Sequence, residues 1–250
     1  MSFKDHFSSD SESYSDFRPA YPGELFRYLA AITPQQNTAW DCATGSGQAA
    51  GMLANYFAQV VATDASAAQI KHAATKENIR YEVALAEQSP IASTSIDLIT
   101  VAQALHWFKL DKFASETNRV LTENGILAAW TYNLLSINDD IDTLTNKLYF
   151  DVVGDYWDFE RSMVEDGYKN INLPFRQIDS PVFTMSAQWG LQQLIGYLNT
   201  WSAVKAYTTA NGANPVDTMT EELTKAWPAG NTTQTVNWPL SLRVWQKATA

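Results

Sequence analysis

The sequence has only one cysteine, Cys42, among its 250 residues. A single thiol excludes an internal disulfide and a zinc site built from cysteines, and no metal is expected. Basic residues are also few, since 17 lysines and arginines stand against 27 acids and give a formal net charge of −10. Because an acidic chain repels phosphate groups, this balance argues against nucleic acid or an anionic membrane as the main partner.

Long hydrophobic runs are missing as well. No window of the chain approaches the roughly 18 consecutive apolar residues that a transmembrane helix needs. The polar, serine-rich residues 1–17 lack the apolar core of a signal peptide. We therefore expect a cytosolic protein, either a monomer or a homodimer, whose partner is a small molecule.

The first half of the chain alternates between two kinds of segment. Short apolar runs typical of buried strands are followed by segments with helical spacing. Strands are predicted over 38–43, 59–64, 79–87, 95–105 and 125–132, and helices over 22–32, 48–57, 66–76 and 111–122. This alternation predicts βαβ units, and hence an α/β fold with a parallel sheet covered by helices on both faces.

The alternation stops after Tyr132, where the chain becomes acidic and aromatic. The second half is predicted to hold mostly helical segments over 133–173, a strand over 175–185 that is interrupted by Pro181, one long helix over 187–207, a helix over 214–227 and a closing strand over 233–247. We expect a single domain over 1–250, with a ligand-binding part at about 14–132 and a lid with the closing strands at about 133–250.

The stretch "WDCATGSGQAAG" (40–51) is the most informative part of the sequence. Gly45 and Gly47 match the loose pattern G-x-G-x-x-[G/A], and Asp64 follows about 20 residues later, where a ribose-binding acid belongs. Such a loop brings its backbone close to a ligand and offers helix N–H groups to a negative charge. A dinucleotide site and a tight turn without a ligand are both compatible with this pattern.

Asp41 favours a third ligand. A carboxylate four residues before Gly45 lies under the loop, where it repels a pyrophosphate but suits an ammonium group. A ligand with both an amine and a carboxylate, such as S-adenosylmethionine, matches Asp41 together with the loop amides. The alternative is that Asp41 caps the loop amides and contacts no ligand.

Four motifs in order resemble the class I S-adenosylmethionine-dependent methyltransferases. They are "WDCATGSGQ", "VVATDAS", "ALAEQSPIASTSIDLITVAQALHWF" and "NRVLTENGILAAW", and the first departs from the family pattern by placing Ala43 where a glycine is usual. The resemblance implies a Rossmann-like fold, with a seven-stranded, mostly parallel sheet, helices on both faces and a helical lid.

Three further stretches resemble the trans-aconitate methyltransferase-like subgroup of the type 11 methyltransferases. They are "YSDFRPAYPGELFRYL", "LIGYLNTWSAVKAY" and "VNWPLSLRVWQK". The resemblance implies an N-terminal arm that closes over the cofactor and carries Tyr14 and Arg18, with Arg18 near the cofactor carboxylate.

The resemblance also implies a set of cofactor-binding residues. Asp64 accepts hydrogen bonds from the ribose hydroxyls, the backbone near Ala86 reads the adenine edge, and Gln103 faces the methionine end. The full set is Tyr14, Arg18, Asp41, Ala43, Gly45, Gly47, Asp64, Ala65, Ala86, Glu87 and Gln103.

Residues for the chemistry are less specific. His106 is a candidate general base or a polar residue that orients a loop, and a carboxylate acceptor needs no base at all. Aromatic side chains either line a substrate chamber or form ordinary core; the candidates are Trp107, Trp157, Trp201 and Tyr207. Arg161, Arg176, Lys205 and Arg243 are cations that could meet an acidic substrate, and the sequence does not choose among them.

We expect methyl transfer from S-adenosylmethionine to a small molecule, at a carboxylate or hydroxyl oxygen. The alternatives are a protein that binds this cofactor without catalysis and a dinucleotide-dependent oxidoreductase.

Overall fold

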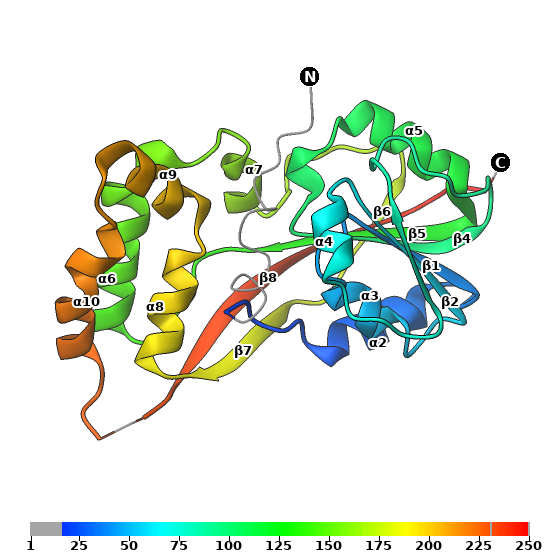
Figure 1. Ribbon diagram of the computed structural model, residues 1–250. Coiled ribbons are helices and arrows are strands. Elements are labelled where there is room, and N and C mark those ends of the chain that lie inside the picture. Colours follow the sequence, from blue (N-terminus) through cyan, green and yellow to red (C-terminus); the bar gives the residue numbers. More distant parts are fainter. Residues whose placement is uncertain (1–16, 231, 250) are drawn as a thin grey trace.

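The computed structural model describes residues 17–230 and 232–249, and a single mixed sheet runs through it (Figure 1). The strand order is β3-β2-β1-β4-β5-β8-β6, and β7 also pairs with β8. The strands are β1 (Thr38–Cys42), β2 (Gln59–Asp64), β3 (Ile79–Val83), β4 (Ile96–Ala102), β5 (Leu121–Tyr132), β6 (Arg176–Ile178), β7 (Phe183–Trp189) and β8 (Gln234–Gln246).

The first five strands are parallel, and β8 runs antiparallel to β5. Because β6 and β7 run antiparallel to β8, they point in the same direction as the first five strands. β6 pairs with the end of β8, with Ile178 opposite Val244, and β7 pairs with its beginning, with Phe183 opposite Leu240. The two strands thus share the seventh position of the sheet. The strand predicted over 175–185 is interrupted around Pro181, as expected, because proline has no N–H to donate to the ladder; its second part, β7, extends to Trp189, beyond the predicted end.

The helices of the first half of the chain follow the expected alternation with strands. The described helices of both halves are α2 (Gly23–Ile32), α3 (Gln48–Leu53), α4 (Ala67–Lys71), η1 (Leu105–Trp107), α5 (Leu110–Val120), α6 (Asp139–Asn146), η2 (Lys147–Val152), η3 (Gly154–Tyr156), α7 (Arg161–Glu165), α8 (Leu191–Asn199), α9 (Ser202–Asn211) and α10 (Pro215–Ala226). In the first half, several helices and strands end earlier than predicted; α4, for example, stops at Lys71 rather than at residue 76.

Two apolar clusters cover the two faces of the sheet. One contains the buried side of α2 and α3, and the other contains the buried side of α5. Within β1, Ala39 belongs to the first cluster and Trp40 to the second, as the alternation of side chains along a strand dictates. The last residue of β1, Cys42, is fully buried in the second cluster.

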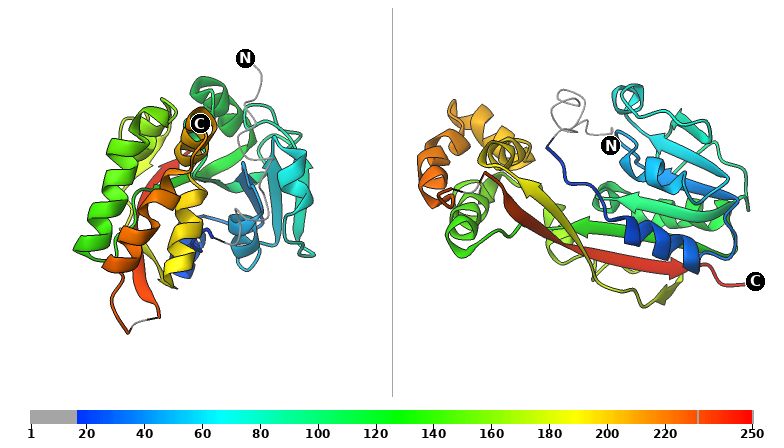
Figure 2. Two further views of the ribbon diagram at one scale, coloured as in Figure 1. Left: turned by 60° about the vertical axis from the view of Figure 1, so that its left-hand side comes forward. Right: turned by 90° about the horizontal axis from the view of Figure 1, so that it is seen from below.

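Helices α6, α8, α9 and α10 gather at one end of the sheet, where β5 ends and β8 begins (Figures 1 and 2). The prediction of one helix over 187–207 was wrong. Residues 187–189 complete β7, where Trp189 pairs with Gln234, and the side chain of Gln193 caps the backbone N–H of Gly190 at the start of α8. Extended backbone at Trp201 then separates α8 from α9.

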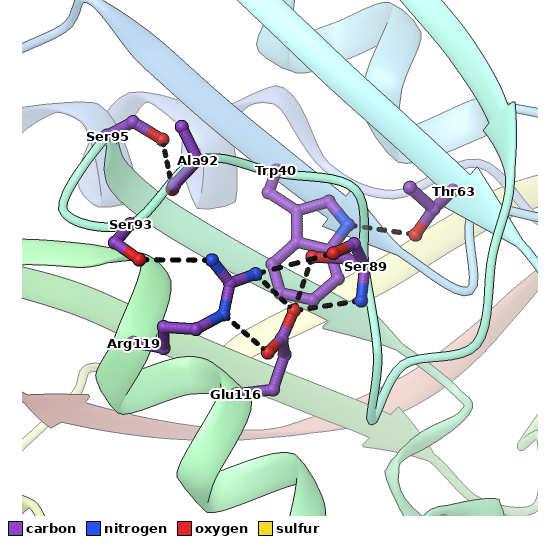
Figure 3. A network of polar contacts seen from close by, with 8 residues as sticks. All are labelled: Trp40, Thr63, Ser89, Ala92, Ser93, Ser95, Glu116 and Arg119. Carbon is purple, nitrogen blue, oxygen red and sulfur yellow. Dashed lines mark hydrogen bonds and ion pairs between the residues drawn. The ribbon is translucent and has the colours of Figure 1, made fainter.

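A polar network fastens the segment between β3 and β4 to α5 (Figure 3). Glu116 accepts hydrogen bonds from the backbone and hydroxyl of Ser89 at 2.8 and 2.6 Å, and from Arg119 at 2.7 Å. Burial opposes ionisation of Glu116, but these hydrogen bonds outweigh it and lower its pKa to about 2. The network fixes the segment that contains Ala86 and Glu87.

In the part of the chain that the structure describes, every helix is too short or too polar to cross a lipid bilayer.

Candidate active site

The glycine loop connects β1 to α3 at the carboxyl edge of the sheet. Ala43, Gly45 and Gly47 all have left-handed backbone, with φ of 57°, 57° and 81°. A Cβ at position 47 would lie 2.3 Å from the hydroxyl of Tyr81, so this position accepts only glycine without rearrangement. Ala43 adopts the same conformation at a steric cost, because its Cβ crowds the following carbonyl.

Asp41 supports this loop from below. One carboxylate oxygen accepts hydrogen bonds from the Thr44 hydroxyl at 2.6 Å and the Ala50 backbone at 3.0 Å, and the other accepts one from the Thr100 hydroxyl at 2.7 Å. Burial raises its pKa to about 6, although the three hydrogen bonds oppose the shift. Both oxygens thus accept hydrogen bonds from within the protein, and the one backbone donor, Ala50, belongs to α3 rather than to the loop.

Asp64 ends β2 beside the same loop. Its carboxylate accepts hydrogen bonds from the backbone of Gly45 at 2.9 Å and of Ser66 at 2.8 Å. Asp64 and the next residue, Ala65, are half-buried. The structure therefore brings together the acid and the glycine that the sequence motif paired.

An exposed apolar surface lies next along this edge. The strand predicted over 79–87 already ends at Val83, and Leu85 is 47% exposed, whereas Ala86 is buried. Glu87 does not point freely outward, because it accepts a hydrogen bond from the backbone of Lys109 at 2.8 Å. An acid, loop amides and exposed apolar carbons together fit a nucleoside that carries an amino-acid tail, which is the chemistry of S-adenosylmethionine.

A cavity of about 90 Å³ lies where β4 and β5 end. It is lined by Arg18, Gln103, His106, Trp107, Tyr132, Asn133, Leu134, Trp157, Asp158, Arg161, Tyr197, Thr200, Trp201 and Ser202. Ligands of open α/β sheets bind at this edge. The structure thus joins six of the predicted site residues, from parts of the chain that are far apart in sequence.

Other predicted residues lie elsewhere. Tyr207 does not line the cavity but packs edge-on against Tyr156 at 5.1 Å. Tyr14 falls outside the described residues. The sequence prediction missed Tyr132, Asn133 and Leu134, although their place directly after a parallel strand is a signal that could have found them.

His106 is held rather than free in this cavity. Its Nδ1 lies 2.9 Å from the hydroxyl of Tyr168, and its ring packs on Trp107 at 4.7 Å. Burial, and then the nearby charge of Arg161, lower its pKa to about 3. An imidazole with so low a pKa is neutral at pH 7 and is a weak proton acceptor, so its geometry favours the orienting role over general base catalysis.

Two guanidinium groups reach the cavity. Arg18 donates to the hydroxyl of Tyr132 at 3.0 Å and lies 5.5 Å from the ring centre of Tyr197. Arg161 is the second, and of the four cations that the sequence left open it alone lines the described cavity.

Arg176 lies on the edge strand β6 and Arg243 on the neighbouring strand β8. Arg176 contacts Gln246, and Arg243 donates to Gln177 at 3.1 Å. Neither these two residues nor Lys205 line the described cavity.

Comparisons with known proteins agree with this geometry. The sequence profile of the family described as "Methyltransferase domain" matches residues 40–129, which contain the glycine loop, Asp64 and Gln103. A protein of Dictyostelium discoideum named as a methyltransferase is 37% identical over 229 residues, which covers 90% of this chain and 87% of the relative.

A solved structure described as a type II methyltransferase from Anaeromyxobacter dehalogenans is 36% identical and superposes with a TM-score of 0.88. The match covers 93% of this chain and 99% of that one. A Saccharomyces cerevisiae relative named as an S-adenosylmethionine-dependent methyltransferase is 28% identical over 132 residues, 49% of this chain and 45% of the relative.

The full-length relatives are methyltransferases rather than oxidoreductases, and their likeness spans both the glycine-loop half and the helical end. The dinucleotide interpretation is therefore set aside. The chain belongs to the methyltransferase domain family and is an S-adenosylmethionine-dependent methyltransferase.

Proposed function

We propose that this enzyme methylates an oxygen of a small anionic metabolite, at a carboxylate or at a hydroxyl of a molecule that carries one. The observation that supports the proposal is the guanidinium group of Arg161 in a small aromatic cavity at the edge of the sheet that holds the cofactor residues. Arg18, which the resemblance assigns to the cofactor carboxylate, lines the same cavity. Guanidinium groups recognise carboxylates by paired, charge-assisted hydrogen bonds. The resemblance to the trans-aconitate methyltransferase-like proteins points the same way.

In this proposal the cofactor lies along the edge formed by the glycine loop, Asp64 and the Ala86 segment. When bound, it would supply a methyl group on a sulfonium: an acceptor oxygen would attack the methyl carbon in line while the carbon–sulfur bond breaks, and S-adenosylhomocysteine would leave. Asp64 would hold the ribose hydroxyls, and the loop amides that follow Ala43 would hold the amino-acid tail. Gln103 lines the cavity between these residues and the guanidinium groups, where the methyl group has to face the acceptor.

The residues of the cavity contribute mainly orientation. Holding two reactants in line replaces the entropy cost of their encounter, and an enclosed site keeps water from the sulfonium. The free space of about 90 Å³ equals that of about three water molecules, so it suits a small acceptor group. Neutral His106 would orient the acceptor by a hydrogen bond, since a carboxylate is already ionised at pH 7.

Turnover on a matched panel tests the proposal. The panel pairs small carboxylic acids with their uncharged amides, and formation of S-adenosylhomocysteine is followed together with the gain of one CH₂ by mass spectrometry. We expect methylation of the acids and not of the amides, and loss of that preference in Arg161→Gln. Methylation confined to uncharged or cationic acceptors would contradict an anionic substrate.

A further inference from the structure

Arg161 is the first residue of α7, and its guanidinium is held on two sides. Its Cζ lies 4.7 Å from the ring centre of Trp157, and its Nε donates a hydrogen bond to the hydroxyl of Tyr149 at 2.7 Å. Stacking on an aromatic face fixes the plane of a guanidinium. With Nε engaged, the two terminal nitrogens remain as the donors that can meet a ligand in the cavity.

The hydroxyl of Tyr149 has a second partner. It donates its own proton to the carboxylate of Glu165 at 2.6 Å. Arg161 and Glu165 are four residues apart on α7, a spacing at which opposite charges normally pair directly. Between these two described residues there is no direct ion pair; the Tyr149 hydroxyl stands between them and bonds to each.

Tyr149 is itself fixed in place. It lies in η2, a π-helical segment, and only 2% of it is exposed. Its carbonyl accepts a hydrogen bond from the indole of Trp157 at 3.2 Å, and its ring packs edge-on against Trp201 at 5.6 Å. π-Helical turns are rare and often occur at functional sites, which makes Tyr149 a candidate for a functional role.

We propose that Tyr149 is a positioning residue that keeps the guanidinium of Arg161 in the substrate cavity and separates it from Glu165. The inference rests on the proposed anionic acceptor. If the hydroxyl is removed, Arg161 loses its Nε partner and Glu165 loses its donor. The two charges then satisfy each other along the exposed side of α7, and the cavity loses a cation.

A double-mutant cycle tests this role with the anionic acceptor found in the panel. Tyr149→Phe keeps the buried ring and removes only the hydroxyl, so we expect KM for the acceptor to rise roughly tenfold, which is about 1.4 kcal/mol. We expect kcat and the affinity for S-adenosylhomocysteine to stay within about threefold. In the double variant Tyr149→Phe with Glu165→Gln, KM should fall back most of the way to the parent value, since no carboxylate then competes for Arg161.

The control is Glu165→Gln alone, which should leave KM within about threefold of the parent. A double variant no better than Tyr149→Phe would overturn the proposal, as would a fall in kcat with unchanged KM. Crystal structures give a readout without substrate: in Tyr149→Phe the guanidinium of Arg161 should contact Glu165, and in the double variant it should lie over Trp157 again. If it stays over Trp157 in Tyr149→Phe, the proposal fails.

Arg161→Gln separates this inference from the proposed function. If that change leaves KM unchanged for every accepted substrate, the anionic acceptor is wrong. If it raises KM while Tyr149→Phe does not, the anionic acceptor stands and the positioning role of Tyr149 is wrong.

Discussion

At the scale of single residues, the glycine loop carries a local strain. Ala43 has a φ of 57°, at the position where the methyltransferase motif that this loop resembles usually has glycine. Left-handed backbone costs a non-glycine residue about 1–2 kcal/mol. A glycine avoids this cost but loses more backbone entropy on folding, which offsets roughly 0.5–1 kcal/mol of the benefit. We expect Ala43→Gly to raise the free energy of unfolding by about 0.5–1 kcal/mol, measured by urea titration. A loss of stability would show that the methyl group of Ala43 makes packing contacts that outweigh the strain.

The raised pKa of Asp41 predicts that the free energy of unfolding depends on pH. Its folded-state pKa is about 6 against an ordinary value of 3.8, so its contribution favours folding fully below pH 3.8 and is lost as the pH rises through 6. The full effect is about 3 kcal/mol. Because Asp41→Asn does not titrate, its stability relative to the parent should rise by about that amount between pH 4 and pH 7. The measurement is a pair of urea titrations at each pH, and a constant difference would contradict the buried, ionised Asp41.

Asp64 is expected to hold the ribose. Asp64→Ala removes a charged acceptor worth roughly 1.5–3 kcal/mol per hydrogen bond, so the affinity for S-adenosylhomocysteine should fall by roughly ten- to several-hundred-fold. The variant also leaves the N–H of Gly45 without this partner, so some stability is lost with it. Calorimetric titration checks the affinity, with His106→Ala as the contrast that should bind normally. Unchanged binding by Asp64→Ala would remove the basis for the motif assignment.

The sequence could predict Asp64 and Gly45 together because both belong to a short motif between a strand and a helix. It could not predict the pKa of Asp41 or His106. Both pKa values depend first on burial in the folded protein. Thr100, which lies 59 residues beyond Asp41, and Arg161, which acts on His106, approach these groups only once the chain has folded. Nor could spacing distinguish Trp201 in the cavity wall from Tyr207, which packs on Tyr156.

At the scale of elements, the strands of the parallel part were predicted well because each is a short apolar run between turn signals. The second half was harder. The segment 187–189 has a composition that also suits a helix, and only its pairing with the distant β8 makes it a strand. The break between β6 and β7, by contrast, could be predicted from Pro181.

The network of Glu116 predicts how the segment after β3 is held. Glu116→Gln keeps the shape but removes the charge that binds Ser89 and Arg119, so we expect a loss of roughly 1–2 kcal/mol in unfolding free energy. Since the same segment contains Ala86, the affinity for S-adenosylhomocysteine should fall by roughly two- to tenfold. Glu123→Gln, at an exposed position on β5, is the matched control. Equal affinities in the two variants would mean that the segment keeps its place without the network.

At the scale of the whole molecule, β8 connects the two parts of the chain (Figure 2). Its end pairs with β5 and β6 in the sheet, whereas its beginning pairs with β7, and Asn237 bridges to Ser136 near the helical end. We propose that the described residues form one domain rather than a cofactor domain with a separate lid. A cytosolic location and the monomeric or homodimeric state stay predictions from the sequence.

The burial of Cys42 gives this enzyme a built-in reporter. Because it is the only thiol and is fully buried at the end of β1, a thiol-specific dye reacts only when the strand opens beneath the glycine loop. A cofactor bound to the glycine loop should suppress this opening of β1. S-adenosylhomocysteine at 100 times its dissociation constant should therefore slow the labelling of Cys42 by about a hundredfold. A labelling rate indifferent to the ligand would mean that the thiol is reached by an opening elsewhere in the molecule. The rate at which the dye labels Cys42 thus reports cofactor occupancy without any engineered probe.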